Sequence, residues 1–195
     1  MDGQMRLNGS AFSVDVEGLQ STIFDPSIVN LFFSDNAANG TITGVEGDFT
    51  YFTNIDGLSV AGAFSFLNTE IEDKLVPTDD VVVGSEFAFA PGYQGNIRVR
   101  KETGMSGGNV GHIQVQYTFS DGSFSDIMGP NKAKQDSYSY IDLRAGISND
   151  ELTAELYVDN VTDERAEISN TFVFDRQRVA YIRPTTIGIR VKRNF

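Results

Sequence analysis

Apolar and polar residues alternate along most of the chain with a period of two. In the last segment the apolar positions are Ile187, Ile189, Val191 and Phe195, and the intervening positions are Thr186, Gly188, Arg190 and Lys192. Because successive side chains of a strand point to opposite faces, this pattern predicts strands with one apolar and one polar face. We predict no helix, and eight strands over residues 4–19, 40–52, 57–68, 92–102, 109–120, 137–148, 151–162 and 182–195.

The first of these strands is less regular than the others. Its apolar phase slips near Ala11 and Phe12, and a slip of this kind predicts a β-bulge at that point.

The predicted connections alternate strictly between long and short. The short connections lie at 54–57, 103–108 and 148–151, and the first contains an Asp-Gly pair typical of hairpins. The long connections lie at about 20–39, 69–91, 121–136 and 163–181. In an up-and-down meander, one end of the sheet would therefore carry only tight turns and the other only long loops. This asymmetry is typical of transmembrane β-barrels, which have short periplasmic turns and long extracellular loops.

The polar positions of the predicted strands carry charges of both signs, at Glu46, Asp48, Arg98, Arg100, Asp142, Arg144, Glu155, Arg190 and Lys192. In a barrel these residues would line a wet lumen while the apolar face meets lipid. In a soluble β-sandwich they would face water, and alternation alone does not separate the two folds. The loop asymmetry and the aromatic content favour the barrel. A soluble sandwich that binds a ligand such as a carbohydrate is the alternative.

Composition narrows the classes of function. Among 195 residues, 15 are Lys or Arg and 27 are Asp or Glu, which gives a net charge of −12 and argues against a nucleic-acid partner. The chain has no cysteine and one histidine, His112, so thiolate chemistry is excluded and a histidine-based zinc site is disfavoured. No apolar stretch is long enough for a transmembrane helix, and residues 1–5 lack a signal-peptide pattern.

Candidate catalytic and metal motifs are weak. Residues 104–108 match G-x-S-x-G, but that motif requires a helix after the serine and a histidine partner, so we interpret them as a turn. His112 is expected to be a polar residue at the start of a strand. Asp35-Asn36 and Asp79-Asp80 lie in predicted long loops, and neither pair has the spacing of a calcium loop. We therefore predict no catalytic residue, no metal site and no cofactor, and a protein that is not an enzyme.

The arginines of the polar face have two interpretations. Arg98, Arg100, Arg144 and Arg190 either attract an anionic ligand or neutralise nearby carboxylates. We favour the second interpretation, with Glu155 and Asp142 as the counterions.

Several motifs follow one another towards the C-terminus. Residues 138–146 read YSYIDLRAG, 154–164 read AELYVDNVTDE, 183–189 read RPTTIGI, and the chain ends at Phe195. Their order and spacing resemble the end of a TonB-dependent outer-membrane receptor. Upstream, 44–49 (GVEGDF) and 90–96 (APGYQGN) resemble other strands of this family. Arg193 departs from the family's alternating apolar ending, but a long cation is tolerated at a membrane interface.

The resemblance implies an architecture larger than this chain. Receptors of this family have a 22-stranded barrel with a plugged lumen. The chain then corresponds to the last eight strands, without the N-terminal plug, the segment that engages TonB, the signal peptide and the preceding strands.

The resemblance also implies a function. The parent would import a nutrient such as a siderophore, vitamin or carbohydrate across the bacterial outer membrane, and the four long loops would contribute to ligand capture. The implied partners are outer-membrane lipid, the plug, TonB and the barrel-assembly machinery, which recognises a terminal aromatic residue, here Phe195, in similar proteins.

A third hypothesis keeps the membrane but changes the closure, because eight strands are enough to form a small barrel of their own. If the segment stays open instead, residues 4–19 and 182–195 are unpaired edge strands. Unpaired edges promote aggregation, so we expect poor solubility of the chain alone.

Overall fold

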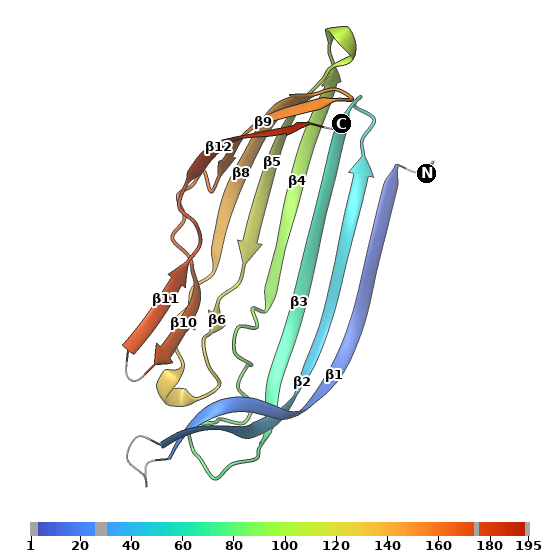
Figure 1. Ribbon diagram of the computed structural model, residues 1–195. Helices are drawn as coiled ribbons and strands as arrows, with labels where there is room; N and C mark the ends of the chain where they lie inside the picture. The colour runs from blue at the N-terminus through green and yellow to red at the C-terminus, as the bar shows by residue number, and fades with distance from the viewer. Residues whose placement is uncertain (1–3, 26–30, 174–175, 194–195) are drawn as a thin grey trace.

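One eight-stranded antiparallel sheet dominates the computed structural model, which describes residues 4–25, 31–173 and 176–193 (Figure 1). In spatial order its strands are β1 (Met5–Asp25), β2 (Leu31–Phe52), β3 (Leu58–Lys74), β4 (Tyr93–Gly104), β5 (Val110–Ser120), β8 (Tyr138–Ser148), β9 (Leu152–Asp159) and β12 (Thr186–Arg193). The eight predicted strands and their meander order are confirmed. The described helices are the single 3-10 turns η1 (Ser106–Gly108) and η2 (Gly129–Asn131). Neither is long or apolar enough to cross a membrane.

Tight turns gather at one end of the sheet, at the top of Figure 1. Gly57 adopts a positive φ of 65°, and a Cβ there would collide with the backbone carbonyl of Glu102, so this turn requires glycine. The turn between β8 and β9 is held by Asn149, whose side-chain oxygen accepts backbone N–H bonds from Glu151 (3.0 Å) and Leu152 (2.8 Å). Residues 104–108 form a turn that includes η1, as predicted.

The connections at the opposite end are more structured than expected. The predicted loop at 20–39 is wrong, because β1 continues to Asp25 and β2 already begins at Leu31. Similarly, β3 continues to Lys74. The segment expected as loop 121–136 contains the short pair β6 (Ser123–Phe124) and β7 (Lys134–Gln135). The segment expected as loop 163–181 contains the hairpin of β10 (Glu167–Val173) and β11 (Arg176–Tyr181).

The sheet has two distinct faces, which we call inner and outer. The inner face is the one on which the segments 75–92 and 121–137 pack, since Phe87 lies against Gly40 at an inner position of β2. The outer face carries exposed apolar side chains over all eight strands, among them Leu7, Val45, Phe66, Ile97, Ile113, Leu143, Leu156 and Ile189. Ile189 is 73% exposed and Leu7 64% exposed. A sheet face this apolar and uncovered requires a partner or an apolar solvent.

Both faces change polarity at the same height of the sheet. On β3 the outer face changes from apolar to polar, from Val60, Phe64 and Phe66 to Asn68, Glu70 and Glu72. The inner face changes from small side chains to larger and mostly apolar ones, from Ala61, Ala63 and Ser65 to Leu67, Thr69 and Ile71. The same change occurs on β1 and β2 at Ala11 and Val45, which are consecutive cross-strand partners of Phe66. The outer apolar side chains therefore form a band of limited height next to the tight turns.

This change of polarity explains why the predicted bulge near Ala11 and Phe12 is wrong. The pairing of β1 with β2 runs without a shift from Met5 to Val16, and the irregularity lies between Val16 and Gln20, where Gly18 has a φ of 66°. Phe12 is an inner residue whose ring lies over Gly44 of β2. The apolar residues move from one face to the other at this point because the environment of each face changes. The pairing register of the strands stays the same.

A small apolar core sits on the inner face at the long-loop end. It joins Ile23, Ala37, Ala38 and Ile71 of the sheet to Val81, Phe87, Ile127 and Met128 of the two packed segments. Ile71 is completely buried, and its backbone N–H donates to the carbonyl of Ser85 (2.8 Å). We call these eight residues the loop core. It fixes the segments 75–92 and 121–137 against the sheet.

The sheet is open among the described residues, with β1 and β12 as its two edges. A self-closed eight-stranded barrel would require these strands to pair, and they do not. A β-sandwich would require a second sheet over the first, whereas the other described sheets are the two-stranded pairs β6–β7 and β10–β11.

The loop core yields a first prediction. Truncation of Ile71 to Ala leaves a cavity in a fully buried site, and such changes cost about 2–5 kcal/mol. We expect Ile71→Ala to accelerate limited proteolysis within residues 75–92. Val82→Ala in the same segment is the control, because Val82 is 58% exposed. Equal cleavage rates in the two variants would show that the loop core does not hold the segment.

Candidate functional site

The charged residues predicted to share a lumen-facing surface all fall on the inner face. Cross-strand partners share a face, and the ladder connects the inner positions of every strand in turn. These positions include Glu46, Asp48, Arg98, Arg100, Asp142, Arg144, Glu155, Arg190 and Lys192. That the inner face lines a barrel lumen stays a prediction.

Most inner arginines are neutralised by neighbouring carboxylates. Arg190 Nη1 lies 3.4 Å from Glu155 Oε1, and Arg100 Nε lies 2.8 Å from Glu102 Oε1. Glu155 is thus a counterion, as expected.

Asp142 does not have the expected role. Its Oδ1 accepts the backbone N–H of Asn160 (2.8 Å), and Arg144 pairs with Asp159 instead. Arg98 and Lys192 have no ion-pair partner within the part of the chain that the structure describes.

His112 is buried on this face, near the tight-turn end. Its Nε2 lies 3.1 Å from Glu155 Oε2, and its ring covers Gly146, where a Cβ would collide with it. Glu155 therefore bridges His112 and Arg190, which ties β5 to β9 and β12. No group of three or more potential metal-binding side chains occurs within the described ranges.

Tyr157 extends the charged network through its ring. The guanidinium of Arg144 lies 5.3 Å from the ring centroid and that of Arg190 lies 5.9 Å from it. The ring packs over Gly188 of β12, where any side chain would clash with it. Cation–π contacts of this kind contribute about 0.5–2 kcal/mol each, so the network helps to hold β8, β9 and β12 together.

Asn160 organises the chain after β9. In the sequence it is one residue of the motif at 154–164, and the motif alone predicts no role for it. It is 3% exposed with a φ of 52°, a left-handed conformation that asparagine tolerates better than most residues. Its Nδ2 donates to the carbonyls of Glu164 and Arg183 (both 2.9 Å), and its Oδ1 accepts the backbone N–H of Glu164 (2.9 Å). One side chain thus joins the start and the end of the segment that contains β10 and β11.

Asp163 supports the same junction. Its Oδ1 accepts the backbone N–H of Thr185 (3.2 Å), and Arg165 lies beside its Oδ2 (3.3 Å). The hydrogen bond from the Thr185 amide lowers the pKa of Asp163 below its ordinary value, and Arg165 contributes a smaller effect in the same direction. Because the folded-state pKa is depressed, the contribution to stability is present above the unfolded pKa and is lost as the pH falls through the folded one.

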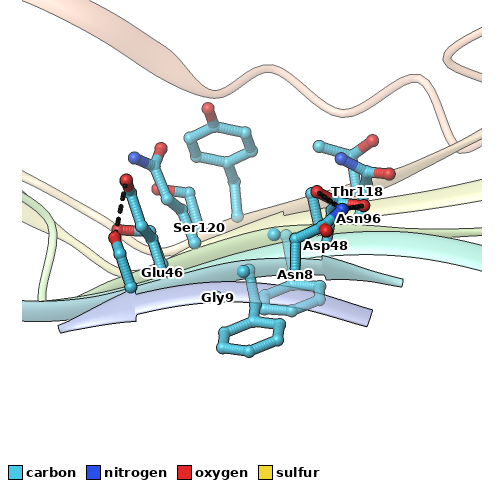
Figure 2. A pocket seen from close by; sticks show the side chains of 16 residues that line it. Asn8, Gly9, Glu46, Asp48, Asn96, Thr118 and Ser120 are labelled. Carbon is cyan, nitrogen blue, oxygen red and sulfur yellow. Dashed lines mark hydrogen bonds between the residues drawn. The ribbon is translucent and has the colours of Figure 1, made fainter. Parts of the chain in front are cut away.

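An open groove of about 640 Å³ lies at mid-height of the inner face (Figure 2). Its polar lining comes from six neighbouring strands, β1 to β5 and β8, and includes Asn8, Ser10, Glu46, Asp48, Ser65, Gln94, Asn96, Thr118, Ser120 and Tyr138. Asn8 donates to both carboxylate oxygens of Asp48 (3.1 Å each), and Ser10 donates to Glu46 (3.2 Å). The lining is rich in amides, hydroxyls and carboxylates and contains no Lys or Arg. A polar ligand in this groove would therefore be bound by hydrogen bonds to these side chains and not by ion pairs with cationic residues.

Phe195, the predicted assembly signal, lies outside the described residues. Arg193 ends β12 opposite Leu152 of β9, at the tight-turn end of the sheet.

Comparison with known proteins gives a consistent picture. The family model described as "TonB dependent receptor-like, beta-barrel" matches residues 1–161. The ferric yersiniabactin uptake receptor FyuA from Yersinia pestis has a similar structure (TM-score 0.77), with 18% identity over 100% of this chain and 28% of that receptor.

Two further solved structures share the fold. The ferric preacinetobactin receptor BauA from Acinetobacter baumannii (TM-score 0.71, 16% identity) is matched over 98% of this chain and 27% of its own. The ferric citrate transporter FecA (TM-score 0.73, 16% identity) is matched over 98% of this chain and 29% of its own. The chain therefore spans less than a third of the length of these proteins, and at such identities the similarity establishes the fold alone.

The Asn160 junction yields a second prediction. Asn160→Gly keeps the left-handed backbone but leaves buried carbonyl and amide groups without partners, at a cost of about 1–3 kcal/mol for each group. We expect a lower midpoint for the thermal loss of the β-sheet circular dichroism signal in detergent. Thr162→Val is the matched control, because Thr162 is exposed and its hydroxyl makes only a long bond (3.3 Å) to Asn160. The same midpoint in both variants would refute the role of Asn160.

Proposed function

Because the chain belongs to the TonB-dependent receptor-like β-barrel family, whose members are non-enzymatic transporters, we propose that it forms part of an outer-membrane receptor for the uptake of a nutrient. The nutrient is of the type that such receptors import, such as a siderophore, a vitamin or a carbohydrate. The chain supplies eight adjacent strands of the barrel wall, the last eight in our interpretation.

The observation that carries this proposal is the band of apolar side chains on the outer face. The band ends at the row of Ala11, Val45 and Phe66, and beyond it the outer face turns polar and acidic. An outward apolar band of limited height, backed by a polar inner face, is the pattern of a transmembrane barrel. We infer that lipid of the bacterial outer membrane covers the band.

The open edges define what else the chain requires. The backbone N–H and C=O groups along the unpaired edges of β1 and β12 need hydrogen-bond partners inside a membrane, because unpaired groups cost several kcal/mol each in hydrocarbon. We propose that the preceding strands of the parent barrel supply these partners, that the plug faces the inner side, and that TonB acts through the plug. Phe195 is the residue that we propose the barrel-assembly machinery recognises.

The membrane part of the proposal is tested with two arginine substitutions on the outer face. Ile97 lies in the middle of the band and is 44% exposed, whereas Asn68 is an exposed residue of the same face beyond the band. An arginine at the midplane of a barrel costs about 2–4 kcal/mol, and near the interface about 0–1 kcal/mol. We expect Ile97→Arg to lower the yield of carbonate-resistant protein in liposomes, and Asn68→Arg to leave it unchanged.

Two outcomes would contradict the proposal. One is a stable, folded monomer of the unmodified chain in detergent-free buffer. The other is equal membrane retention of the two arginine variants.

A further inference from the structure

A small cavity of about 190 Å³ lies at the long-loop end of the inner face, between three segments that are far apart in the sequence. Phe89 and Pro91 come from the segment before β4, Asp121, Ser123, Gln135 and Asp136 from the segment between β5 and β8, and Glu167 and Ile168 from β10. Gln94, Ser120 and Tyr138 line both this cavity and the 640 Å³ groove, so the two spaces lie side by side.

The cavity wall is rich in hydrogen-bond acceptors and has no cation of its own. Asp121, Asp136 and Glu167 line it together with two amides, and no Lys or Arg does. The carboxylates keep free lone pairs. Asp121 Oδ1 accepts the N–H of Gly122 (2.8 Å), and Lys134 is 3.9 Å from Asp136 with both side chains exposed. Glu167 accepts two long bonds, from Asn170 Nδ2 (3.3 Å) and from the Tyr181 hydroxyl (3.4 Å), so each of its oxygens can accept a further donor. An anionic ligand would be repelled here, whereas a ligand with hydroxyl donors would be accommodated.

One donor in the wall has no partner. Gln135 is 3% exposed, its Oε1 accepts the hydroxyl of Ser123 (2.9 Å), and its Nε2 is buried without an acceptor among the described residues. A buried donor left unsatisfied costs about 1–3 kcal/mol, so it marks a place where a ligand acceptor is favoured. A ligand that carries only cationic donors would not satisfy it.

An aromatic surface stands at the rim. Phe89 is 45% exposed although its φ is 54°, a conformation that costs a non-glycine residue energy and that clusters at functional sites. The backbone N–H of Phe89 donates to the carbonyl of Phe124 (2.7 Å), which holds this conformation. Tyr138 stacks on Tyr140 with centroids 6.4 Å apart, which fixes a second ring beside the cavity.

We propose that this cavity binds one ring of an uncharged, polyhydroxylated ligand, a saccharide, whose further units follow the groove. Sugar hydroxyls donate to Asp121, Asp136 and Glu167, and a sugar oxygen accepts from Gln135 Nε2. The apolar face of the ring packs on Phe89. A few fixed polar groups beside an apolar surface are the usual composition of a small-molecule site. This inference rests on the proposed function, because it names the class of nutrient that the inner face of the receptor binds.

The test uses the full chain in detergent micelles, first on a glycan array that holds neutral, sialylated and sulfated glycans. The neutral glycan with the strongest signal is then titrated calorimetrically, in parallel with ferric citrate as an anionic chelate and spermidine as a polycation. We expect selective retention of neutral glycans. Phe89→Ala and Gln135→Leu should each weaken binding by about tenfold, as the loss of one buried hydrogen bond or packing contact implies.

Val83→Ala is the matched control, because Val83 is 53% exposed in the same connection and does not line the cavity. The β-sheet circular dichroism spectrum in detergent verifies that Gln135→Leu still folds, and Phe89 is exposed enough for its truncation to be tolerated. Tighter binding of ferric citrate or spermidine than of any glycan would overturn the proposal, as would an array without retained neutral glycans. If the chain meanwhile inserts into membranes, the proposed function stands and only the ligand class fails.

Discussion

The hydrogen-bond ladder that joins the eight strands is the constraint on which the rest of the structure depends. Its register places every second residue on the same face, and a slip of one position would exchange the two faces of a strand. The ladder also pairs the backbone N–H and C=O groups of the six strands between β1 and β12. Such pairing is required in the hydrocarbon core of a membrane. Among the described residues of this sheet, β1 and β12 are the two strands with an unpaired edge. The charged inner network, the outer band and the need for neighbouring strands all follow from this arrangement.

The faces are defined by their surroundings rather than by the strands themselves. At the row of Ala11, Val45 and Phe66 the outer face turns from apolar to polar and the inner face from polar to apolar, while the ladder continues. On the tight-turn side of the row the inner face is open and charged. On the long-loop side the loop core covers the inner face and holds the connecting segments in place. These segments supply Phe89 and Gln135, which line the cavity.

Local patterning was sufficient to predict the eight strands and the inner position of charges such as Arg144 and Glu155, because alternation depends only on the two faces of a strand. It failed where contacts between distant segments decide. The extensions of β1 and β2 read as a loop because the inner apolar positions there pack on segments 75–92 and 121–137. Asp159 replaced Asp142 as the partner of Arg144, and the bonds of Asn160 reach across to Arg183. Neither follows from spacing.

The central claim is that the outer band contacts lipid while the inner face does not. The chain has no cysteine, so single cysteines at Val99, Phe66, Arg98 and Asn68 can each carry an environment-sensitive fluorophore in liposomes. We expect blue-shifted emission and quenching by lipid-borne nitroxides at Val99 and Phe66, and neither at Arg98 or Asn68. Equal quenching at Val99 and Arg98, neighbours on opposite faces of β4, would contradict it.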